Sequence, residues 1–263
     1  MTEGTRGCGQ PSPLLSPAVS RNRIGIDIGG SGIKAGLVDV AKGVVISERL
    51  RIETPQPSTP HAVARATGDL VRDLDGGDVV GIGFPSIIRD GVVMTANNID
   101  EAWIGGNAVE LFEEAIGSEV RLINDADAAA LAEAEFGSAK GIPGTVVVIT
   151  FGTGIGSGVL LDGKLLRNVE LGMLEFGGVY PAEAKYSAKA RRREDLDWDE
   201  WGGRINDFIR HVDRIFSPTR IVVGGGVSRH WEEFSHTIDA DLPVVRANLA
   251  NDAGLIGAAV LAT

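Results

Sequence analysis

Short apolar runs separated by glycine-rich turns open the chain and predict β-strands. The stretch IGIDIGGSGIKAGLVDV, residues 24–40, has strand-like runs on both sides of a glycine-rich tip. A Lys42-Gly43 turn and the β-branched run Val44-Val45-Ile46 come next. We therefore predict a β-hairpin, followed by a further strand over Ser47–Ile52.

The same pattern occurs a second time, 123 positions further along the chain. VVVITFGTGIGSGVLLDG, residues 146–163, again reads as two strands around a glycine-rich tip, and a third strand is predicted at Lys164–Leu166. The shift aligns Gly29 with Gly152. A repeat of this length predicts a duplicated unit and hence two similar lobes.

Helical and buried-strand patterns alternate after each hairpin. Helices are predicted at His61–Leu74, Asn107–Ile116, Ala126–Phe136, Asp199–Ile215 and Gly254–Ala262, and short buried strands at Val79–Phe84, Val120–Ile123 and Ile221–Val223. Alternating strands and helices indicate an α/β fold. Two lobes of this kind leave a cleft between them, which is the default place for a ligand site.

Composition and charge narrow the class of protein. The 263 residues carry a net charge of −11, which argues against a general nucleic-acid or membrane-surface binder. The single cysteine, Cys8, excludes an internal disulfide framework and a cysteine-rich zinc site. No apolar run approaches the ~18 residues of a membrane helix. Residues 1–20 lack a continuous apolar stretch, so we expect a disordered tail and a cytoplasmic protein.

The glycines of the first tip do not form a known nucleotide fingerprint. Gly30, Gly32 and Ala35 fit G-x-G-x-x-A, and the acidic Glu53 follows at about the spacing of a dinucleotide site. That motif requires a helix at this point, whereas the sequence predicts a strand. The spacing of Lys34 also excludes a P-loop. A glycine-rich hairpin tip preceded by one carboxylate, Asp27, remains.

The second tip is the better candidate for anion binding. In TFGTGIG, residues 150–156, glycines let backbone N–H groups approach an anion, and Thr150 and Thr153 add hydroxyl donors. A plain hairpin would not need so many of these residues, so we favour a phosphate ligand. A buried strand at 221–223 also ends in three glycines, which permits close approach of a ligand but is weak evidence alone.

Other polar segments have both a functional and a purely structural interpretation. Asn124 and Asp125 precede an alanine-rich helix, where either could be its N-cap or a carboxylate able to take a proton from an alcohol. The segment 83–103 could supply polar loop residues to a pocket, although asparagines in loops are more often turn formers. Glu170 and Glu175 could accept hydroxyls of a sugar or be surface charges. The basic run at 185–193 is either a solvated helix face or a binding track for a polyanion.

Taken together, these segments resemble the ROK family of sugar kinases. DIGGSGIK (27–34), TFGTGIG and VVGGGVS (222–228) resemble its two phosphate motifs and its nucleotide-side motif. ANN…W, NDADAA and ELGxLE resemble its sugar-site segments, and the resemblance covers roughly residues 22–262. TPQPSTP (54–60) and SAKARRREDLDWDEW (187–201) are similar to segments of the branch that uses polyphosphate to phosphorylate glucose.

The resemblance implies the two-lobed α/β fold of actin and hexokinase, which is ribonuclease H-like. It divides the chain into a tail at 1–20, a first lobe at 21–121 completed by the helix 252–263, and a second lobe at 122–251. It implies an enzyme that transfers a phosphoryl group from inorganic polyphosphate, with ATP as a possible second donor, to the 6-hydroxyl of glucose or a related hexose. It also implies Mg²⁺ as cofactor, no structural zinc and a homodimer.

Residue roles follow from the same resemblance. Asp125 matches the catalytic base, and Asp27 matches the carboxylate that holds Mg²⁺ through water. The sugar ligands would be Ser86, Asn98, Asn124, Asp125, Glu170 and Glu175, with Pro85 beside them. The donor ligands would be Asp27, Gly29, Gly30, Ser31, Gly32, Lys34, Thr150, Gly152, Thr153, Gly154, Gly224, Gly225 and Gly226. The polyphosphate track would be Lys185, Lys189, Arg191, Arg192 and Arg193.

The sequence departs from the family at one sugar-site position. Met173 stands where the family has a histidine that hydrogen-bonds the sugar, and methionine is only a weak acceptor. The loss of one hydrogen bond weakens binding by about tenfold. Three hypotheses follow: a polyphosphate glucokinase, a hexokinase that uses ATP, and a degenerate sugar-binding protein. The intact Asp125 favours the two enzymes.

Overall fold

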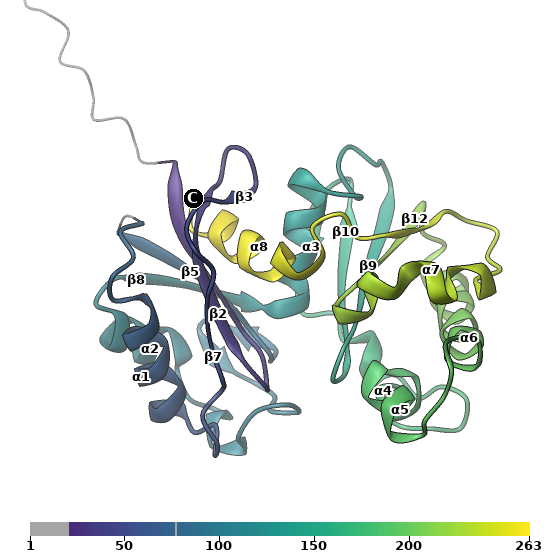
Figure 1. Cartoon of the computed structure of the whole chain (residues 1–263), viewed down its shortest axis with the longest axis horizontal. Helices are drawn as coiled ribbons and strands as arrows, with labels where there is room; N and C mark the ends of the chain where they lie inside the picture. The colour runs from purple at the N-terminus through teal and green to yellow at the C-terminus, as the bar shows by residue number, and fades with distance from the viewer. Residues whose placement is uncertain (1–20, 77) are drawn as a thin grey trace, which may run out of the picture.

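Two β-sheets, each with helices on both faces, form the two halves of the molecule (Figure 1). The computed structural model describes residues 21–76 and 78–263, so the tail expected at 1–20 lies outside the described residues. The two predicted hairpins and their glycine-rich tips are present. They are β1 (Asn22–Ile28) with β2 (Ile33–Asp39), and β9 (Thr145–Phe151) with β10 (Ile155–Leu161).

The first sheet has the strand order β3-β2-β1-β5-β8, and β4 also pairs with β2. Its remaining strands are β3 (Val44–Val45), β4 (Leu50–Ile52), β5 (Val79–Phe84) and β8 (Glu119–Asn124). Helices α1 (Pro60–Val71) and α2 (Ala108–Ile116) pack against one face, over a core that contains Phe84, Trp103 and Phe112. This core fixes the strand ends from which the polar side chains project.

The second sheet has the order β11-β10-β9-β12-β13. Its other strands are β11 (Lys164–Leu166), β12 (Arg220–Gly224) and β13 (Val244–Arg246), the last of which the sequence pattern did not predict. The long helix α6 (Trp198–Phe216) covers one face, and a capping box between Asp197 and Glu200 sets its start. The apolar face of α6 packs against β9 and β12.

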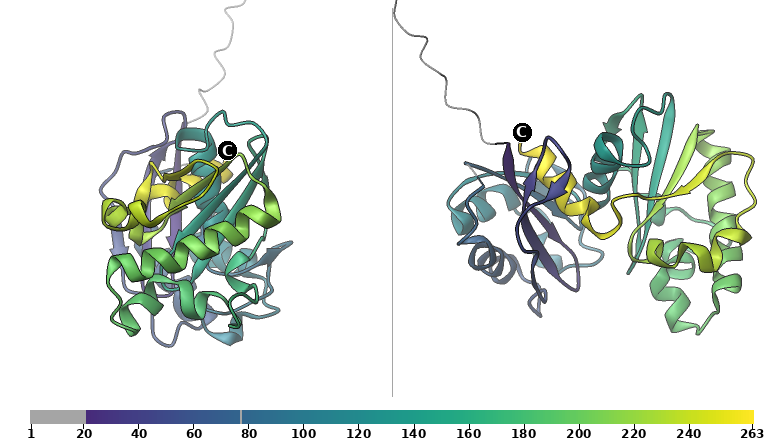
Figure 2. Two further views of the ribbon diagram at one scale, coloured as in Figure 1. Left: turned by 90° about the vertical axis from the view of Figure 1, so that its right-hand side faces the viewer. Right: turned by 45° about the horizontal axis from the view of Figure 1, so that its top comes forward.

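Two helices lie between the sheets. Helix α3 (Asp125–Phe136) and helix α8 (Ala253–Leu261) pack against each other, and Figure 2 shows them between the two halves. Helix α8 packs closely on its neighbours because glycines lie at its contacts. A Cβ on Gly81 would lie 1.7 Å from the carbonyl oxygen of Ala258, and one on Gly257 would lie 1.7 Å from that of Ala128. The C-terminal helix therefore packs on the first sheet as well as on α3.

Short elements complete the described chain. They are β6 (Ile88–Arg89), β7 (Val92–Val93), α4 (Glu183–Tyr186), α5 (Ala188–Arg193), α7 (Trp231–Phe234), and the 3₁₀ turns η1 (Glu101–Trp103), η2 (Leu171–Met173), η3 (Gly226–His230), η4 (Ser235–Thr237) and η5 (Ala250–Asp252). None of the helices in the described part of the chain is both long and apolar enough to span a bilayer.

Candidate active site

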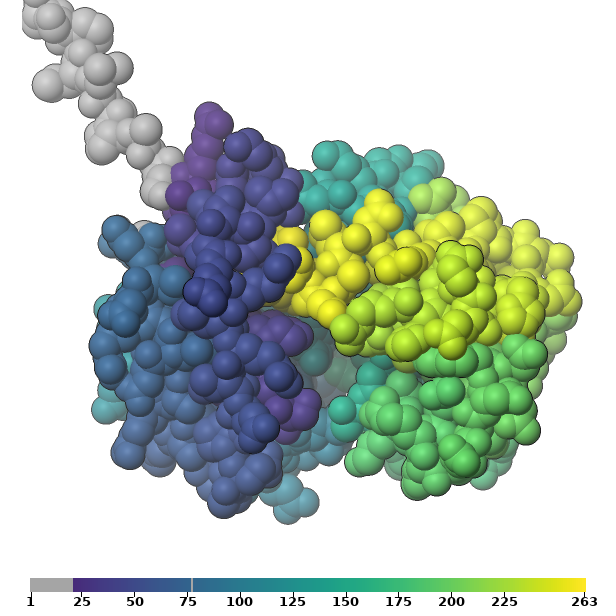
Figure 3. All heavy atoms as spheres, viewed as in Figure 1, coloured from purple at the N-terminus to yellow at the C-terminus, as the bar shows by residue number. Residues whose placement is uncertain are grey.

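A cavity of about 820 Å³ lies between the two lobes. Figure 3 shows the surface hollowed between the first half of the chain, in purple and blue, and the second half, in green. The following predicted site residues line it: Asp27, Gly29, Gly30, Ser31, Lys34, Ser86, Asn98, Asn124, Asp125, Thr150, Gly152, Thr153, Gly154, Glu170, Gly225 and Gly226. Segments that are far apart in the sequence therefore meet at one place.

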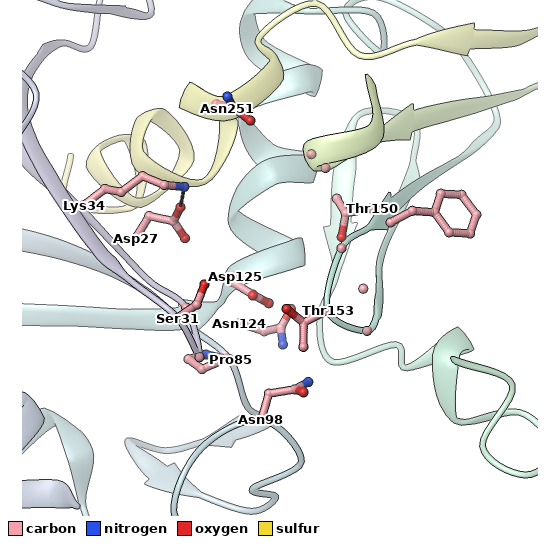
Figure 4. Close-up of a pocket in the computed structure, with 18 of the residues that line it drawn as sticks. Asp27, Ser31, Lys34, Pro85, Asn98, Asn124, Asp125, Thr150, Thr153 and Asn251 are labelled. Carbon is pink, nitrogen blue, oxygen red and sulfur yellow. Dashed lines mark hydrogen bonds and ion pairs between the residues drawn. The ribbon is translucent and has the colours of Figure 1, made fainter. Parts of the chain in front are cut away.

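The first glycine tip enters the cavity at the end of β1. Lys34 Nζ donates to Asp27 Oδ2 at 2.8 Å, directly across the β1–β2 pair (Figure 4). The tip packs closely on the opposite loop, because a Cβ on Gly30 would lie 2.6 Å from the carbonyl oxygen of Asn98. Gly32 and Gly224 do not line this cavity, although Gly224 lines a smaller neighbouring one.

The structure separates the roles of Asn124 and Asp125, for which the sequence allowed either a helix cap or a carboxylate in a cavity. Asn124 is the N-cap of α3: its Oδ1 accepts the N–H groups of Ala126, at 2.9 Å, and Asp127, at 3.1 Å. Its Nδ2 donates to Glu170 Oε1 at 3.3 Å. Because Asn124 caps the helix, the Asp125 carboxylate, which accepts the Ala126 N–H at 2.8 Å, is left facing the cavity.

Three carboxylic acids have raised pKa values, two that line the cleft and one that is buried beneath it. Burial raises the pKa of Asp125 to about 7, and the charges of Asp27 and Glu170 add to the effect. Burial also raises the pKa of Glu170 to about 7, with contributions from Asp127 and Glu183. The pKa of Asp127 is raised by burial to about 6, against the hydrogen bond from the backbone of residue 168. Asp127 is fully buried and does not line the cavity.

The second glycine tip faces the first across the cavity (Figure 4). A Cβ on Gly152 or Gly226 would meet nothing within 4 Å, so the space beside both glycines is open. Gly225 has φ +78° and lies against the backbone of Phe151, which a Cβ would approach to 2.6 Å. The N–H groups, open space and absence of side chains here suit an anion.

Comparison with known proteins identifies the family. Residues 23–183 match the ROK family. This chain belongs to the ROK family. It is 40% identical over 252 residues to the polyphosphate glucokinase of Mycobacterium tuberculosis, covering 95% of each chain. It is 38% identical over 268 residues to that of Mycobacterium leprae, covering 100% of this chain and 82% of the relative.

Solved structures of ROK proteins share the fold. The inorganic polyphosphate/ATP-glucomannokinase of Arthrobacter sp. strain KM aligns with TM-score 0.88 and 47% identity, over 91% of this chain and 97% of the other. A ROK family glucokinase from Streptomyces griseus, in complex with glucose and AMPPNP, aligns with TM-score 0.80 and 26% identity, over 92% and 99%. These matches confirm the expected two-lobed fold of the actin and hexokinase type.

One carboxylate expected at the cavity is absent from its wall, and another carboxylate lines it. Glu175 is exposed and does not line the cavity, because its neighbours Leu174 and Phe176 pack on the core of the second lobe and turn it outward. Glu183, at the start of α4, lines the cavity, and its Oε2 accepts the Ile155 N–H at 3.0 Å. No pattern in the sequence around Glu183 indicated that its side chain would line the cavity.

Three arginines in the cavity were also missed by the sequence analysis. Arg49 and Arg51 flank Leu50 on β4, and Arg229 lies in η3 just after the third glycine-rich motif. The alternation of basic and apolar residues from 49 to 52 was the available signal. It gave no hint that β4 pairs with β2 at the cleft.

The basic run lies beside the second tip and outside the cavity. The Arg191 guanidinium stacks 3.6 Å from the centre of the Trp198 ring, and Arg193 pairs with Glu194 at 2.6 Å. Lys189 is exposed, and its backbone N–H donates to the carbonyl oxygen of Gly152 at 3.1 Å. The basic run therefore adjoins the second glycine tip, but the guanidinium groups of Arg191 and Arg193 already have protein partners. Lys185 lies 5.4 Å from the Tyr186 ring, and Arg192 is exposed.

The carboxylates of the cleft suit a magnesium ion held mainly by water and phosphate. Across the described residues there is no group of three or more His, Cys, Asp or Glu side chains that could hold a metal ion. Mg²⁺ commonly takes only one or two protein carboxylates and keeps several waters. Asp27, which lines the cavity beside both tips, meets that requirement.

Proposed function

We propose that this ROK-family protein transfers a phosphoryl group from inorganic polyphosphate to the 6-hydroxyl of glucose, with ATP as a second donor. The observation that carries the proposal is the Asp125 carboxylate, which faces a cavity between two glycine tips because Asn124 caps the helix in its place. The relatives named as polyphosphate glucokinases and as a polyphosphate/ATP-glucomannokinase support the same reaction.

Asp125 is the group that takes the proton from the sugar hydroxyl. A general base works best when its pKa lies near the working pH, and burial raises the pKa of Asp125 to about 7. Removal of the proton makes the hydroxyl oxygen a better nucleophile toward the terminal phosphoryl group of the donor. That group is then transferred with little further covalent help from the protein, so positioning and charge neutralisation dominate.

Polar side chains around Asp125 would bind the other hydroxyls of glucose. Each sugar hydroxyl is both a donor and an acceptor, which suits amide and carboxylate partners. Asn98, Asn124, Glu170 and Glu183 line this end of the cavity, and Glu183 takes the place first assigned to Glu175. The Oγ atom of Ser86 is buried and has no hydrogen-bond partner among the described residues, so it is free to bind a hydroxyl.

The two glycine tips would hold the donor. The tips line the open end of the cavity through Gly29–Ser31 and Gly152–Gly154. The N–H groups of Gly29 and Gly152 donate to carbonyl oxygens within the tips. The N–H groups of the other tip residues and the hydroxyls of Thr150 and Thr153 would therefore bind the phosphates. Bound through Asp27 and water, Mg²⁺ would neutralise charge on the phosphates. Lys34 pairs with Asp27, so it both limits the negative charge there and orients the carboxylate.

A coupled assay for glucose 6-phosphate, with Mg²⁺ and either polyphosphate or ATP, tests the function. Turnover that requires polyphosphate and glucose together is the expected result. Failure to turn over with either donor would reject the enzyme and leave the sugar-binding alternative. That alternative rests on Met173, whose Sδ accepts from Asn97 Nδ2 at 3.4 Å in place of the family histidine.

We also infer that the basic run guides polyphosphate to the second tip, through Lys189 and Arg192 in particular. Both are exposed and have no side-chain partner among the described residues. Neutralising both should raise the KM for polyphosphate more than that for ATP. The Arg214→Gln variant, at an exposed position of α6 outside the basic run, is the control and should change neither. If the double variant behaves like this control, the run is only a solvated helix face and ATP is an equal candidate donor. We further infer a homodimer from the family, which light scattering of the purified chain would test.

A further inference from the structure

A row of charged side chains crosses the first sheet and faces the cleft. Asp27 on β1 lies opposite Lys34 on β2, and Lys34 lies opposite Arg51 on β4. Residues directly opposite in antiparallel strands project from the same face, where like charges destabilise the pair. The Lys34 ammonium is neutralised by Asp27, at 2.8 Å. Nothing in the row neutralises Arg51.

The Arg51 guanidinium lies over the first glycine tip. A Cβ placed on Gly32 would be 3.4 Å from both Nε and Nη2 of Arg51. No hydrogen bond, ion pair or ring contact joins this guanidinium to another side chain in the described ranges 21–76 and 78–263. Arg49, two residues earlier, differs in this respect, because Asp252 binds its Nε at 2.9 Å and its Nη2 at 2.6 Å.

A second arginine without a partner enters the cavity from the opposite lobe. Arg229 belongs to η3, which begins at Gly226, and it is exposed at the cavity wall. Within the described chain its guanidinium has no ion pair or hydrogen bond either. The space beside Gly152 and Gly226, on the same lobe, is open.

Two free guanidinium groups at one cavity are notable in an acidic protein. The chain carries a net charge of −11, and its other surface arginines include several that pair with carboxylates, such as Arg193 and Arg204 with Glu194. Guanidinium groups present a planar set of N–H donors that matches phosphate oxygens in pairs. A free guanidinium beside a glycine-rich tip therefore suits a phosphate group.

We propose that Arg51 and Arg229 bind the phosphate chain of the donor from opposite lobes, on either side of the glycine tips. This inference rests on the proposed function and adds two donor-binding residues that the resemblance did not assign. A donor that bridges the two lobes would also hold them together around glucose. The ligand class is a linear polyphosphate, which carries several phosphate groups along one chain and so offers one to each guanidinium group at the cavity wall.

The test compares two cleft variants with two matched controls in the full chain. Arg51→Gln and Arg229→Gln remove the charges at the cleft. Arg65→Gln, on the exposed side of α1, and Arg214→Gln, on the exposed side of α6, each remove one charge from the same lobe away from the cavity. Glucose 6-phosphate formation is measured with polyphosphate varied at saturating glucose, and then with glucose varied at saturating polyphosphate.

Each cleft variant should lower kcat/KM for polyphosphate by about tenfold, the value of one hydrogen-bonded charge contact. The cleft variants should keep the KM for glucose within about twofold of the native value, since the sugar end is untouched. Both control variants should keep kcat/KM for polyphosphate and the KM for glucose within about twofold of the native values. Calorimetric titration with polyphosphate in the absence of glucose should show the same loss of affinity. Arg51→Gln should unfold at or above the native temperature, because it removes a repulsion with Lys34.

Either of two results would contradict the proposal. If both cleft variants match the controls in KM and in calorimetric affinity for polyphosphate, the arginines do not bind the donor. An equal rise in the KM for glucose would also overturn it, because the effect would then be a general disturbance of the cleft. If the native protein forms no glucose 6-phosphate, the proposed function fails, and the calorimetric comparison still decides whether Arg51 and Arg229 bind polyphosphate.

Discussion

Replacing Asp125 by Asn separates the chemistry of this side chain from its structural role. The amide is nearly isosteric, and its Oδ1 can still accept the Ala126 N–H that Asp125 accepts at 2.8 Å. The N-cap of α3 is untouched because it belongs to Asn124. An amide cannot take a proton from the sugar hydroxyl, and loss of a general base costs about 10²- to 10⁴-fold in rate. We expect kcat to fall by that amount while the KM for polyphosphate changes little.

The same substitution should stabilise the protein at alkaline pH. The pKa of Asp125 is about 7 in the folded chain, against an ordinary value of 3.8. The difference is about 3 units, and at 1.36 kcal/mol per unit the ionised carboxylate destabilises the fold by up to about 4 kcal/mol. Since the raised pKa favours the protonated form, this group stabilises the fold most below about pH 4. That contribution is lost as the pH rises through about 7.

Urea unfolding of both proteins at several pH values measures the difference. The Asn variant should be more stable than the native protein by about 2–4 kcal/mol at pH 8, and the gap should close toward pH 4. Asp207→Asn, at an exposed position of α6, is the control and should show no such gap. Near-native turnover in the Asp125→Asn variant would refute the role of Asp125 as the general base. A stability difference that does not change with pH would show that burial of the Asp125 charge does not destabilise the fold.

Five further results are expected. In the native protein, kcat/KM should fall about tenfold per pH unit below pH 7, as protonation inactivates the base, and a flat pH–rate profile would contradict its pKa. Glu183→Gln should raise the KM for glucose by at least about tenfold, whereas Glu175→Gln should leave it unchanged. Gly152→Ala should keep the native unfolding temperature and raise the KM for the donor, because its side chain would enter open space. Gly225→Ala should lower the unfolding temperature, because φ is +78° and the backbone of the second tip is in the way. Met173→His should lower the KM for glucose by about threefold to tenfold, and an unchanged KM would show that this position does not reach the sugar.

The sequence predicted the hairpins and the main helices because apolar alternation, glycine turns and capping residues determine these elements locally. The alternation of apolar residues around each glycine tip predicted the two hairpins, and the three-glycine end of β12 was also recognised. Helix α3 began within one residue of its predicted start, because Asn124 is a strong capping residue. Strand β13 was missed because Val244–Arg246 is only three residues long, too short to show the alternation of a strand.

The residues that the sequence did not predict are those placed by tertiary contacts. Arg51 reaches the cleft only because β4 pairs with β2, and Glu183 reaches it only because α4 packs beside the second tip. Glu175 matched a family segment, yet the packing of Phe176 on Tyr186 turned it outward. Short motifs locate a loop in the sequence, but they do not determine which side chains of the loop face the ligand.

In the proposed function, the cleft has an acidic end for glucose and a basic end for the donor. At the glucose end, Glu170 and Glu183 lie beside Asn98 and Asp125. At the donor end, the cavity wall carries Lys34, Arg51 and Arg229. A polyanionic donor is therefore attracted to one end and repelled from the other, while neutral glucose is not. The base Asp125 lines the same cavity as both groups of residues, so the terminal phosphoryl group of a donor bound in this way can meet the sugar hydroxyl. A cleft with this polarity lets an acidic protein use a polyanion without binding it along the sugar site.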